Sequence, residues 1–200
     1  MENFIEIFTL ITGVIYIILE IRQKNSMWLV GVLTSLAAML VFFQQGLYAS
    51  FALNTYYLIT SFIGIWQWNR DKRKLGEIEG VNNGEGAVHL NKLTLKVVLM
   101  SAFALVAGTS VLAQLMAVFE NPMSYMDSFI AVLSALATWW LVRAYIEQWW
   151  LWIVADFMST LLCASQGLWW MTALYGVYAA SAIYGYIHWK RKGVYVNQEV

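Results

Sequence analysis

Charged side chains are scarce in this sequence of 200 residues. Lys and Arg together number 12, as do Asp and Glu, so charged residues make up 12 % of the chain, against about 25 % in soluble domains. So few charges cannot provide the polar surface that a soluble protein of this length exposes to water. Because the net charge is zero, no positive field is present to hold a nucleic acid, and we expect no such partner.

Cysteine, histidine and proline are also rare. The single cysteine, Cys163, excludes a disulfide framework and a metal site built from several thiolates. The two histidines, His89 and His188, are too few for a histidine-rich metal centre. The one proline, Pro122, falls in an expected outer loop, so no proline kink marks a gate within a helix. We therefore expect neither a metal nor a cofactor.

Apolar residues dominate what remains. Hydrophobic residues form 60 % of the chain, and 11 residues are Trp. A helix needs about 20 mostly apolar residues to cross a bilayer, and seven segments reach or approach that length. These segments are Asn3–Ile21, Met27–Gln44, Leu47–Trp68, Thr94–Phe119, Met126–Tyr145, Trp149–Gln166 and Leu168–His188. The sequence thus predicts an all-α integral membrane protein with seven transmembrane helices in a lipid bilayer.

The lengths of the connections predict how the chain is organised. Little more than Gln45-Gly46 joins the second and third segments, and Gly167 joins the sixth and seventh, so each pair forms an antiparallel hairpin. The longest connection, Asn69–Leu93, carries a charge run and the Gly/Asn-rich stretch Val81–Gly86, which is typical of a solvated loop. We expect a three-helix repeat in residues 1–68, this cytoplasmic loop in residues 69–93, a connector helix in residues 94–119, a second three-helix repeat in residues 126–188 and a cytoplasmic tail in residues 189–200.

The basic residues are distributed unevenly between the two sides of the expected membrane. With the N-terminus outside, all 12 Lys and Arg residues fall in the inner connections or the C-terminal tail. They are Arg22, Lys24, Arg70, Lys72, Arg73, Lys74, Lys92, Lys96, Arg143, Lys190, Arg191 and Lys192. Positively charged loops face the cytoplasm, so we expect a multi-pass protein of the cell (inner) membrane with its C-terminus inside.

An internal repeat links the two ends of the chain. Gln45-Gly46-Leu47-Tyr48 recurs as Gln166-Gly167-Leu168-Trp169, and at this offset of 121 twelve of the 49 positions from Arg22 to Arg70 are identical. The first three segments are thus echoed by the last three, with the fourth as connector. The three segments of the first repeat and the connector together make an even number, so both repeats begin on the same side of the membrane. This predicts parallel repeats in a 3+1+3 arrangement. Such repeats occur in small-solute transporters, where the substrate lies between them near the midplane.

Several short motifs resemble those of the PnuC family of vitamin transporters. They are Trp149-x-x-Trp152 with a polar residue at 156, Ser165-Gln166-Gly167-Leu168, Tyr184-Gly185-Tyr186-x-His188-Trp189, Trp28-x-x-Gly31 and Gly64-x-Trp66-Gln67-Trp68. The resemblance covers about residues 5–192 without the Lys72–Lys92 connection. It implies a fold similar to full-length SWEET sugar transporters and a homotrimer.

The same resemblance implies an activity. Family members move a vitamin such as nicotinamide riboside, thiamine or riboflavin by facilitated diffusion, and a cytoplasmic kinase traps it by phosphorylation. Asp156 stands where the family usually has asparagine, which leaves the identity of the vitamin open. We expect nicotinamide riboside, the substrate after which the family is named, with thiamine as the alternative.

Three residues of the sixth segment form the main candidate site. Trp149, Trp152 and Asp156 lie on one narrow face of a helix, at 0°, 300° and 340° if each residue turns about 100°. A carboxylate within a membrane costs about 2.5–3.5 kcal/mol, which makes Asp156 a candidate functional residue. The alternatives are a structural hydrogen bond for Asp156 and membrane-interface anchoring for the two tryptophans.

An indole face beside a carboxylate suits a flat aromatic cation. Cation–π contact contributes about 0.5–2 kcal/mol, and Asp156 would add charge pairing. The pyridinium of nicotinamide riboside and the thiazolium of thiamine both fit, whereas neutral riboflavin fits less well. The equivalents of the three site residues in the first repeat are Trp28, Gly31 and Ser35. The second repeat would thus supply a bulky wall to the site, and the smaller residues of the first repeat would leave room for an asymmetric ligand.

A second polar stripe follows the third and seventh segments. Asn54 and Tyr57 share one helix face, and their equivalents at the offset of 121 are Tyr175 and Tyr178. Their amide and hydroxyl groups suit a ribose or a carboxamide, and the family resemblance places polar contacts near Asn54 and Tyr175. Hydrogen bonds between helices are the alternative.

Other functional classes fit the sequence less well. A membrane enzyme needs paired acids, a histidine cluster or a nucleophile beside a base, and Asp156 is the only acid deep within an expected helix. A channel needs rings of like charge or a filter loop, and neither occurs in the sequence. We therefore expect a transporter and not an enzyme. Proton-coupled uptake stays open, because Asp156 could carry a proton.

Overall fold

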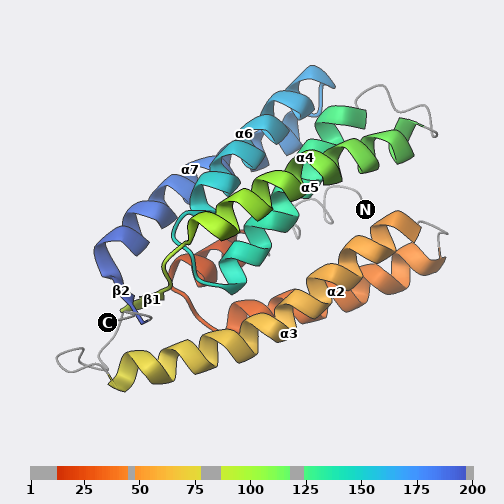
Figure 1. Ribbon diagram of the computed structural model, residues 1–200. Helices are drawn as coiled ribbons and strands as arrows, with labels where there is room; N and C mark the ends of the chain where they lie inside the picture. Colours follow the sequence, from red (N-terminus) through yellow and green to blue (C-terminus); the bar gives the residue numbers. More distant parts are fainter. Residues whose placement is uncertain (1–12, 45–47, 78–86, 118–123, 197–200) are drawn as a thin grey trace. The chain divides into compact units, whose positions relative to one another are not determined.

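The computed structural model describes residues 13–44, 48–77, 87–117 and 124–196. Residues 13–21 are helical, and six longer helices and two short strands follow in these parts of the chain (Figure 1). They are α2 (Ser26–Gln44), α3 (Tyr48–Glu77), β1 (Val88–Leu90), α4 (Leu95–Ala117), α5 (Ser124–Val142), α6 (Gln148–Ser165), α7 (Trp169–Lys192) and β2 (Gly193–Tyr195). Helix is thus found in each of the seven segments predicted to be helical. Residues 3–12, the Gln45-Gly46 turn and the stretch Val81–Gly86 lie outside the described residues.

Two of the described helices are long and apolar enough to cross a membrane by length and composition. They are Leu95–Ala117, with a mean hydropathy of 2.0, and Tyr125–Val142, with 1.4. Large apolar side chains along α4 are exposed, among them Leu99, Phe103 and Val106. A helix that exposes such a face needs an apolar environment, which a bilayer provides.

Contacts divide the described chain into two compact units. The first is formed from residues within 1–91, 141–144 and 188–200, and the second from residues within 92–140 and 145–187. The first unit therefore contains α2, α3 and both strands, and also the last residues of α5 and of α7. The second unit contains α4, α6 and most of α5 and α7.

The prediction of a solvated loop over Asn69–Leu93 is wrong for two of its stretches. Helix α3 continues to Glu77, because the charge run consists largely of good helix formers and Gln67 hydrogen-bonds to Asp71 one turn later. Strand β1 is buried and pairs in parallel with β2, His89 opposite Val194. The expected tail is likewise ordered at its start, since α7 runs to Lys192 and β2 follows.

The offset of 121 recurs in the backbone of two helix ends. Gln23 and Ala144 adopt left-handed conformations, with φ of 49° and 52°. In each turn the left-handed residue donates its amide to the carbonyl three residues earlier, at 2.9 Å. The residue after it, Lys24 or Tyr145, donates its amide to the carbonyl five residues earlier, at 2.9 Å in the first turn and 3.1 Å in the second. This is the Schellman motif, in which the left-handed position is usually occupied by glycine. The same turn thus ends the helix before α2 and the helix before α6.

The offset recurs in side-chain packing as well. In the first unit the indole of Trp28 lies on Gly64, where an added Cβ would come within 2.4 Å of the ring. In the second unit Trp149 lies on Gly185, where an added Cβ would come within 2.5 Å. Real Cβ atoms do not approach a ring so closely, so each glycine allows its indole to contact the helix backbone. These pairs join α2 to α3 and α6 to α7.

Candidate functional site

Asp156 is buried in the second unit. It lies in the middle of α6 and is 7 % exposed, and its main-chain carbonyl accepts a hydrogen bond from Thr160. The neighbouring hydroxyls of Ser159 and Thr160 are satisfied, because each donates to a carbonyl one turn earlier at 2.8 Å. Asp156 is therefore the polar group of this helix that a bound substrate could pair with.

Trp152 precedes Asp156 by one turn on the same face of α6. The side chain is partly exposed, but its indole Nε1 is buried and has no hydrogen-bond partner among the described residues. A buried indole N–H usually finds an acceptor. Trp152 thus offers a ring face and an unused donor close to the carboxylate.

Tyr175 and Tyr178 complete the polar part of the second unit. Both lie on α7, are partly buried, and pack edge to face with ring centroids 6.1 Å apart. The charge of Asp156 acts electrostatically on both hydroxyls. Asp156, Tyr175 and Tyr178 thus belong to the same unit, although sequence reasoning placed them on two separate stripes.

Helix α6 ends soon after the site for a local reason. Gly167 has φ of 73°, a left-handed conformation that costs glycine little, and Leu168 donates to the carbonyl of Cys163 at 2.9 Å. The chain then reverses directly into α7. This short turn makes α6 and α7 the hairpin that the sequence predicted.

Trp149 and Trp28 are held more tightly than Trp152. Their side chains are 2 % and 1 % exposed, and both rings cover a glycine of the next helix. Trp28 also packs edge to face on Trp68, with centroids 5.0 Å apart. Membrane anchoring by exposure at the interface, the alternative for Trp149, does not agree with this burial.

Asn54 and Tyr57 lie one turn apart on α3 in the first unit. Both are partly buried, and the ring of Tyr57 lies 5.6 Å from that of Tyr56. Ser61, one turn further, donates to the carbonyl of Tyr57 at 2.8 Å. These residues form a polar stripe within their own unit, as predicted, and their part in binding stays a prediction.

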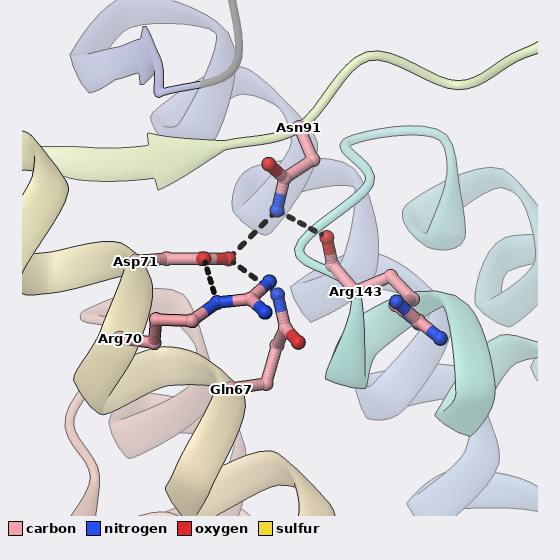
Figure 2. Close-up of polar contacts among 5 residues, drawn as sticks. All are labelled: Gln67, Arg70, Asp71, Asn91 and Arg143. Carbon is pink, nitrogen blue, oxygen red and sulfur yellow. Dashed lines mark hydrogen bonds and ion pairs between the residues drawn. The ribbon is translucent and has the colours of Figure 1, made fainter.

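Sequence reasoning missed a buried polar cluster at one end of the first unit. Figure 2 shows this Asp71 cluster, which consists of Gln67, Arg70, Asp71, Asn91 and the carbonyl of Arg143. Asp71 is fully buried and accepts hydrogen bonds from Gln67 at 3.0 Å and from Asn91 at 2.8 Å. Asn91 also donates to the Arg143 carbonyl at 2.8 Å, and Arg70 Nε lies 3.6 Å from Asp71. Only the spacing between Gln67 and Asp71 was visible in the sequence.

His89 lies beside this cluster, and both its main-chain amide and its main-chain carbonyl are hydrogen-bonded. The side chain of Gln23 donates to the carbonyl of His89 and accepts from its amide, both at 2.9 Å. Lys72 donates to the Gln23 carbonyl at 2.9 Å. The imidazole is fully buried, and its nitrogens have no hydrogen-bond partner among the described residues. Burial lowers the pKa of His89 to about 4, although Asp71 nearby acts in the opposite direction.

In the same unit, two indoles donate hydrogen bonds to carbonyls at the ends of helices that are distant in the sequence. Trp68 donates from Nε1 to the carbonyl of Leu141 at 3.1 Å, and Trp189 donates to the carbonyl of Ile21 at 3.0 Å. The two rings lie 6.4 Å apart, edge to face, and both are fully buried. Trp68 and Trp189 are separated by the offset of 121, so each indole caps the last turn of a helix from the other half of the sequence.

The polar residues suit an organic substrate better than a metal. In the part of the chain that the structure describes, no three His, Cys, Asp or Glu side chains gather as a metal ion would require. The candidate site residues of the second unit instead offer the carboxylate of Asp156, the phenols of Tyr175 and Tyr178 and the indole of Trp152.

Comparison with known proteins identifies the class. The chain is similar to the protein in a structure described as the crystal structure of the vitamin B3 transporter PnuC, with a TM-score of 0.65 at 24 % sequence identity over 92 % of this chain and 79 % of that one. At this identity the likeness concerns the fold. The class is thus an all-helical fold like that of this structure.

Sequence comparison identifies the family. The sequence profile of the nicotinamide mononucleotide transporter family matches residues 3–191, and the chain belongs to this family. Nicotinamide riboside transporter PnuC of Neisseria mucosa is 27 % identical over 90 % of this chain and 70 % of its own length. The protein of the same name from Escherichia coli is 24 % identical over 94 % and 85 %, and that from Haemophilus influenzae is 21 % identical over 95 % and 80 %. The resemblance to PnuC transporters is confirmed, and the protein is a membrane protein.

Proposed function

We propose that the protein carries nicotinamide riboside across the cell membrane by facilitated diffusion, and that a cytoplasmic kinase traps the riboside by phosphorylation. Family membership and the names of the relatives support transport of a vitamin of this kind. Diffusion and trapping rest on the family resemblance alone.

The buried carboxylate of Asp156 is the observation that supports this choice of substrate. In an apolar environment an uncompensated charge is costly, and a cationic ligand offsets that cost. The pyridinium ring of nicotinamide riboside would stack on Trp152 and pair with Asp156. The hydroxyls of Tyr175 and Tyr178 would hydrogen-bond the ribose, and Trp149 would form the wall behind it.

The site favours the riboside over the mononucleotide that gives the family its description. Residues 145–187 contain no Lys, Arg or His, so a phosphate ester bound beside Asp156 would face a carboxylate without a compensating cation. Like charges in a medium of low dielectric constant repel strongly. The riboside, which lacks the phosphate, avoids this repulsion.

Thiamine is the second candidate because, like nicotinamide riboside, it carries a positively charged aromatic ring that could pair with Asp156. Its thiazolium is also a flat aromatic cation, and the aspartate in place of the usual asparagine favours a cation more than it favours one vitamin. Thiamine lacks a ribose, so it would use the two tyrosines less.

We further propose two parallel three-helix repeats joined by α4, as in full-length SWEET transporters. The paired turns at Gln23 and Ala144 and the paired indole–glycine contacts support the repeats. In this arrangement Trp28, Asn54 and Tyr57 would complete the site from the first repeat. The placement of Lys and Arg supports an outer N-terminus and an inner C-terminus. A homotrimer rests on the family resemblance.

Binding measured side by side tests the substrate. The purified protein is titrated with nicotinamide riboside, thiamine, riboflavin and nicotinamide mononucleotide in a calorimeter. We expect the riboside to bind best and the mononucleotide at least tenfold more weakly. Tighter binding of thiamine would make the protein a thiamine transporter, and preference for the mononucleotide would contradict the role of Asp156.

Coupling is tested separately from binding. Uptake into proteoliposomes is measured with and without an imposed proton gradient. Facilitated diffusion predicts the same rate and the same end point in both cases. A rate that follows the gradient would instead make Asp156 a proton carrier.

A further inference from the structure

Helix α3 carries an exposed stripe that changes from apolar to cationic along its length. Ile59, Phe62, Trp66, Arg70 and Arg73 fall within an arc of about 80° and span about 21 Å of helix. The first three are large apolar side chains with high exposure, 60 % for Trp66, and Arg73 is exposed as well. The stripe therefore crosses from a surface that suits acyl chains to one that suits a charged headgroup.

Arg70 is stacked on the tryptophan at the transition. Its guanidinium carbon lies 5.0 Å from the centre of the Trp66 ring, and its side chain is 40 % exposed. Its Nε is buried and lies 3.6 Å from Asp71 Oδ1. A guanidinium that is stacked on a ring and partly exposed can present its fork of donors to a phosphate, whose geometry it matches.

The second half of the sequence lacks this arrangement. At the offset of 121, Trp66 corresponds to Ile187, Arg70 to Arg191 and Arg73 to Val194. The stacked Trp–Arg pair and the second arginine are thus not a by-product of the repeat. Arg191, which is exposed and lies one turn after the aliphatic Ile187 instead of a tryptophan, provides a matched control.

We propose that Trp66, Arg70 and Arg73 bind the headgroup phosphate of an anionic phospholipid, whose acyl chains lie along Phe62 and Ile59. Two guanidinium groups favour a lipid with net negative charge over one whose phosphate is balanced by an amine or choline. The tryptophan lies where the apolar part of α3 ends, as interfacial tryptophans do, and holds Arg70 at headgroup height.

Native mass spectrometry of the full-length protein in detergent tests the proposal. The protein is incubated with equal amounts of phosphatidylglycerol and phosphatidylcholine of the same acyl chains, and the ratio of the two bound lipids is measured. Each arginine should raise the ratio of bound phosphatidylglycerol to bound phosphatidylcholine about fivefold, which corresponds to about 1 kcal/mol. We expect the double variant Arg70→Gln, Arg73→Gln to lower the ratio about tenfold or more, and Arg191→Gln to change it less than twofold.

Three results would overturn the proposal. One is an unchanged ratio in the double variant, and another is an equal loss in Arg191→Gln, which would indicate general attraction to a basic surface. The third is full competition by soluble glycerol phosphate, which would assign the site to free phosphate. Arg73→Gln alone, expected to lower the ratio about fivefold, provides the same test if loss of Arg70 disturbs Asp71. A change in oligomeric state at constant ratio would instead assign the stripe to a second copy of the chain.

Discussion

Two kinds of tryptophan are found on the same face of α6. Trp149 is closely packed on Gly185, so its ring has little freedom to adapt to a ligand. Trp152, one turn deeper, is partly exposed and keeps an unused N–H. At the scale of single residues, Trp149 therefore shapes the site and Trp152 is the better candidate for direct contact with substrate.

Replacing the buried carboxylate tests charge pairing. Asp156→Asn keeps the size of the side chain and removes the charge, so affinity for nicotinamide riboside should fall roughly tenfold, the effect expected for losing a charged hydrogen bond. A neutral analogue that lacks the pyridinium charge should lose much less. The measurement is calorimetric titration of both ligands, with Asp127→Asn on α5 as the control. Equal losses for both ligands would rule out charge pairing.

Replacing Trp152 tests ring stacking. Trp152→Phe keeps a π face and should weaken binding of the riboside roughly threefold, whereas Trp152→Ala should weaken it tenfold or more, in line with about 0.5–2 kcal/mol for a cation–π contact. Titration of the purified variants measures both values. Unchanged affinity of the alanine variant would remove Trp152 from the site.

At the scale of helices, each unit contains one indole that lies on a glycine of the neighbouring helix. Because Trp28–Gly64 joins α2 to α3 and Trp149–Gly185 joins α6 to α7, the close approach of each hairpin depends on a missing side chain. Gly176 in α7 is different, since nothing lies within 4 Å of an added Cβ.

Alanine substitutions test these contacts. Gly64→Ala and Gly185→Ala should each lower the free energy of unfolding by about 1–3 kcal/mol, because the new Cβ displaces an indole. Gly176→Ala should be neutral or stabilise the helix by up to about 1 kcal/mol. Thermal unfolding in detergent, followed by tryptophan fluorescence, measures the three variants. Equal behaviour of all three would show that the indoles are loosely packed.

We expect His89 on strand β1 to make the stability of the first unit sensitive to acid. Burial lowers the pKa of His89 from 6.5 to about 4; the charge of Asp71 acts to raise this pKa and that of Lys72 to lower it. Between these pH values the unfolded chain binds a proton that the folded chain does not, so the free energy of unfolding falls as the pH drops, by at most about 3 kcal/mol. Above pH 6.5 the effect is absent.

His89→Phe should remove this pH dependence. Phenylalanine preserves the edge-to-face contact with Trp68, and no hydrogen bond of the imidazole to a described residue is lost. Unfolding midpoints measured from pH 4 to 7 should then vary less than in the parent protein. The same acid sensitivity in His89→Phe would assign it to another group.

At the scale of the whole molecule, the sequence predicted what depends on local composition. Long apolar segments predicted the helices, and the offset of 121 predicted a repeat. The structure added paired turns and paired indole–glycine contacts at the same offset, which the sequence analysis had not named. These features follow from residues close together in the chain or from repetition, both of which are visible in one sequence.

Long-range contacts between short polar segments could not be predicted. Strands β1 and β2 have three residues each and are separated by about half of the chain. The Asp71 cluster needs Asn91 and the carbonyl of Arg143, and no spacing rule links either to Asp71. A charge run is usually solvated, so the fully buried Asp71 could not be recognised within it.

Uptake of labelled nicotinamide riboside into proteoliposomes is the most direct test of the proposed function. Without kinase or ATP, we expect saturable uptake that stops when the inner and outer concentrations are equal. It should not respond to a proton gradient, and it should be slower in Asp156→Asn. Uptake no faster than in protein-free liposomes, with folded protein present, would contradict it.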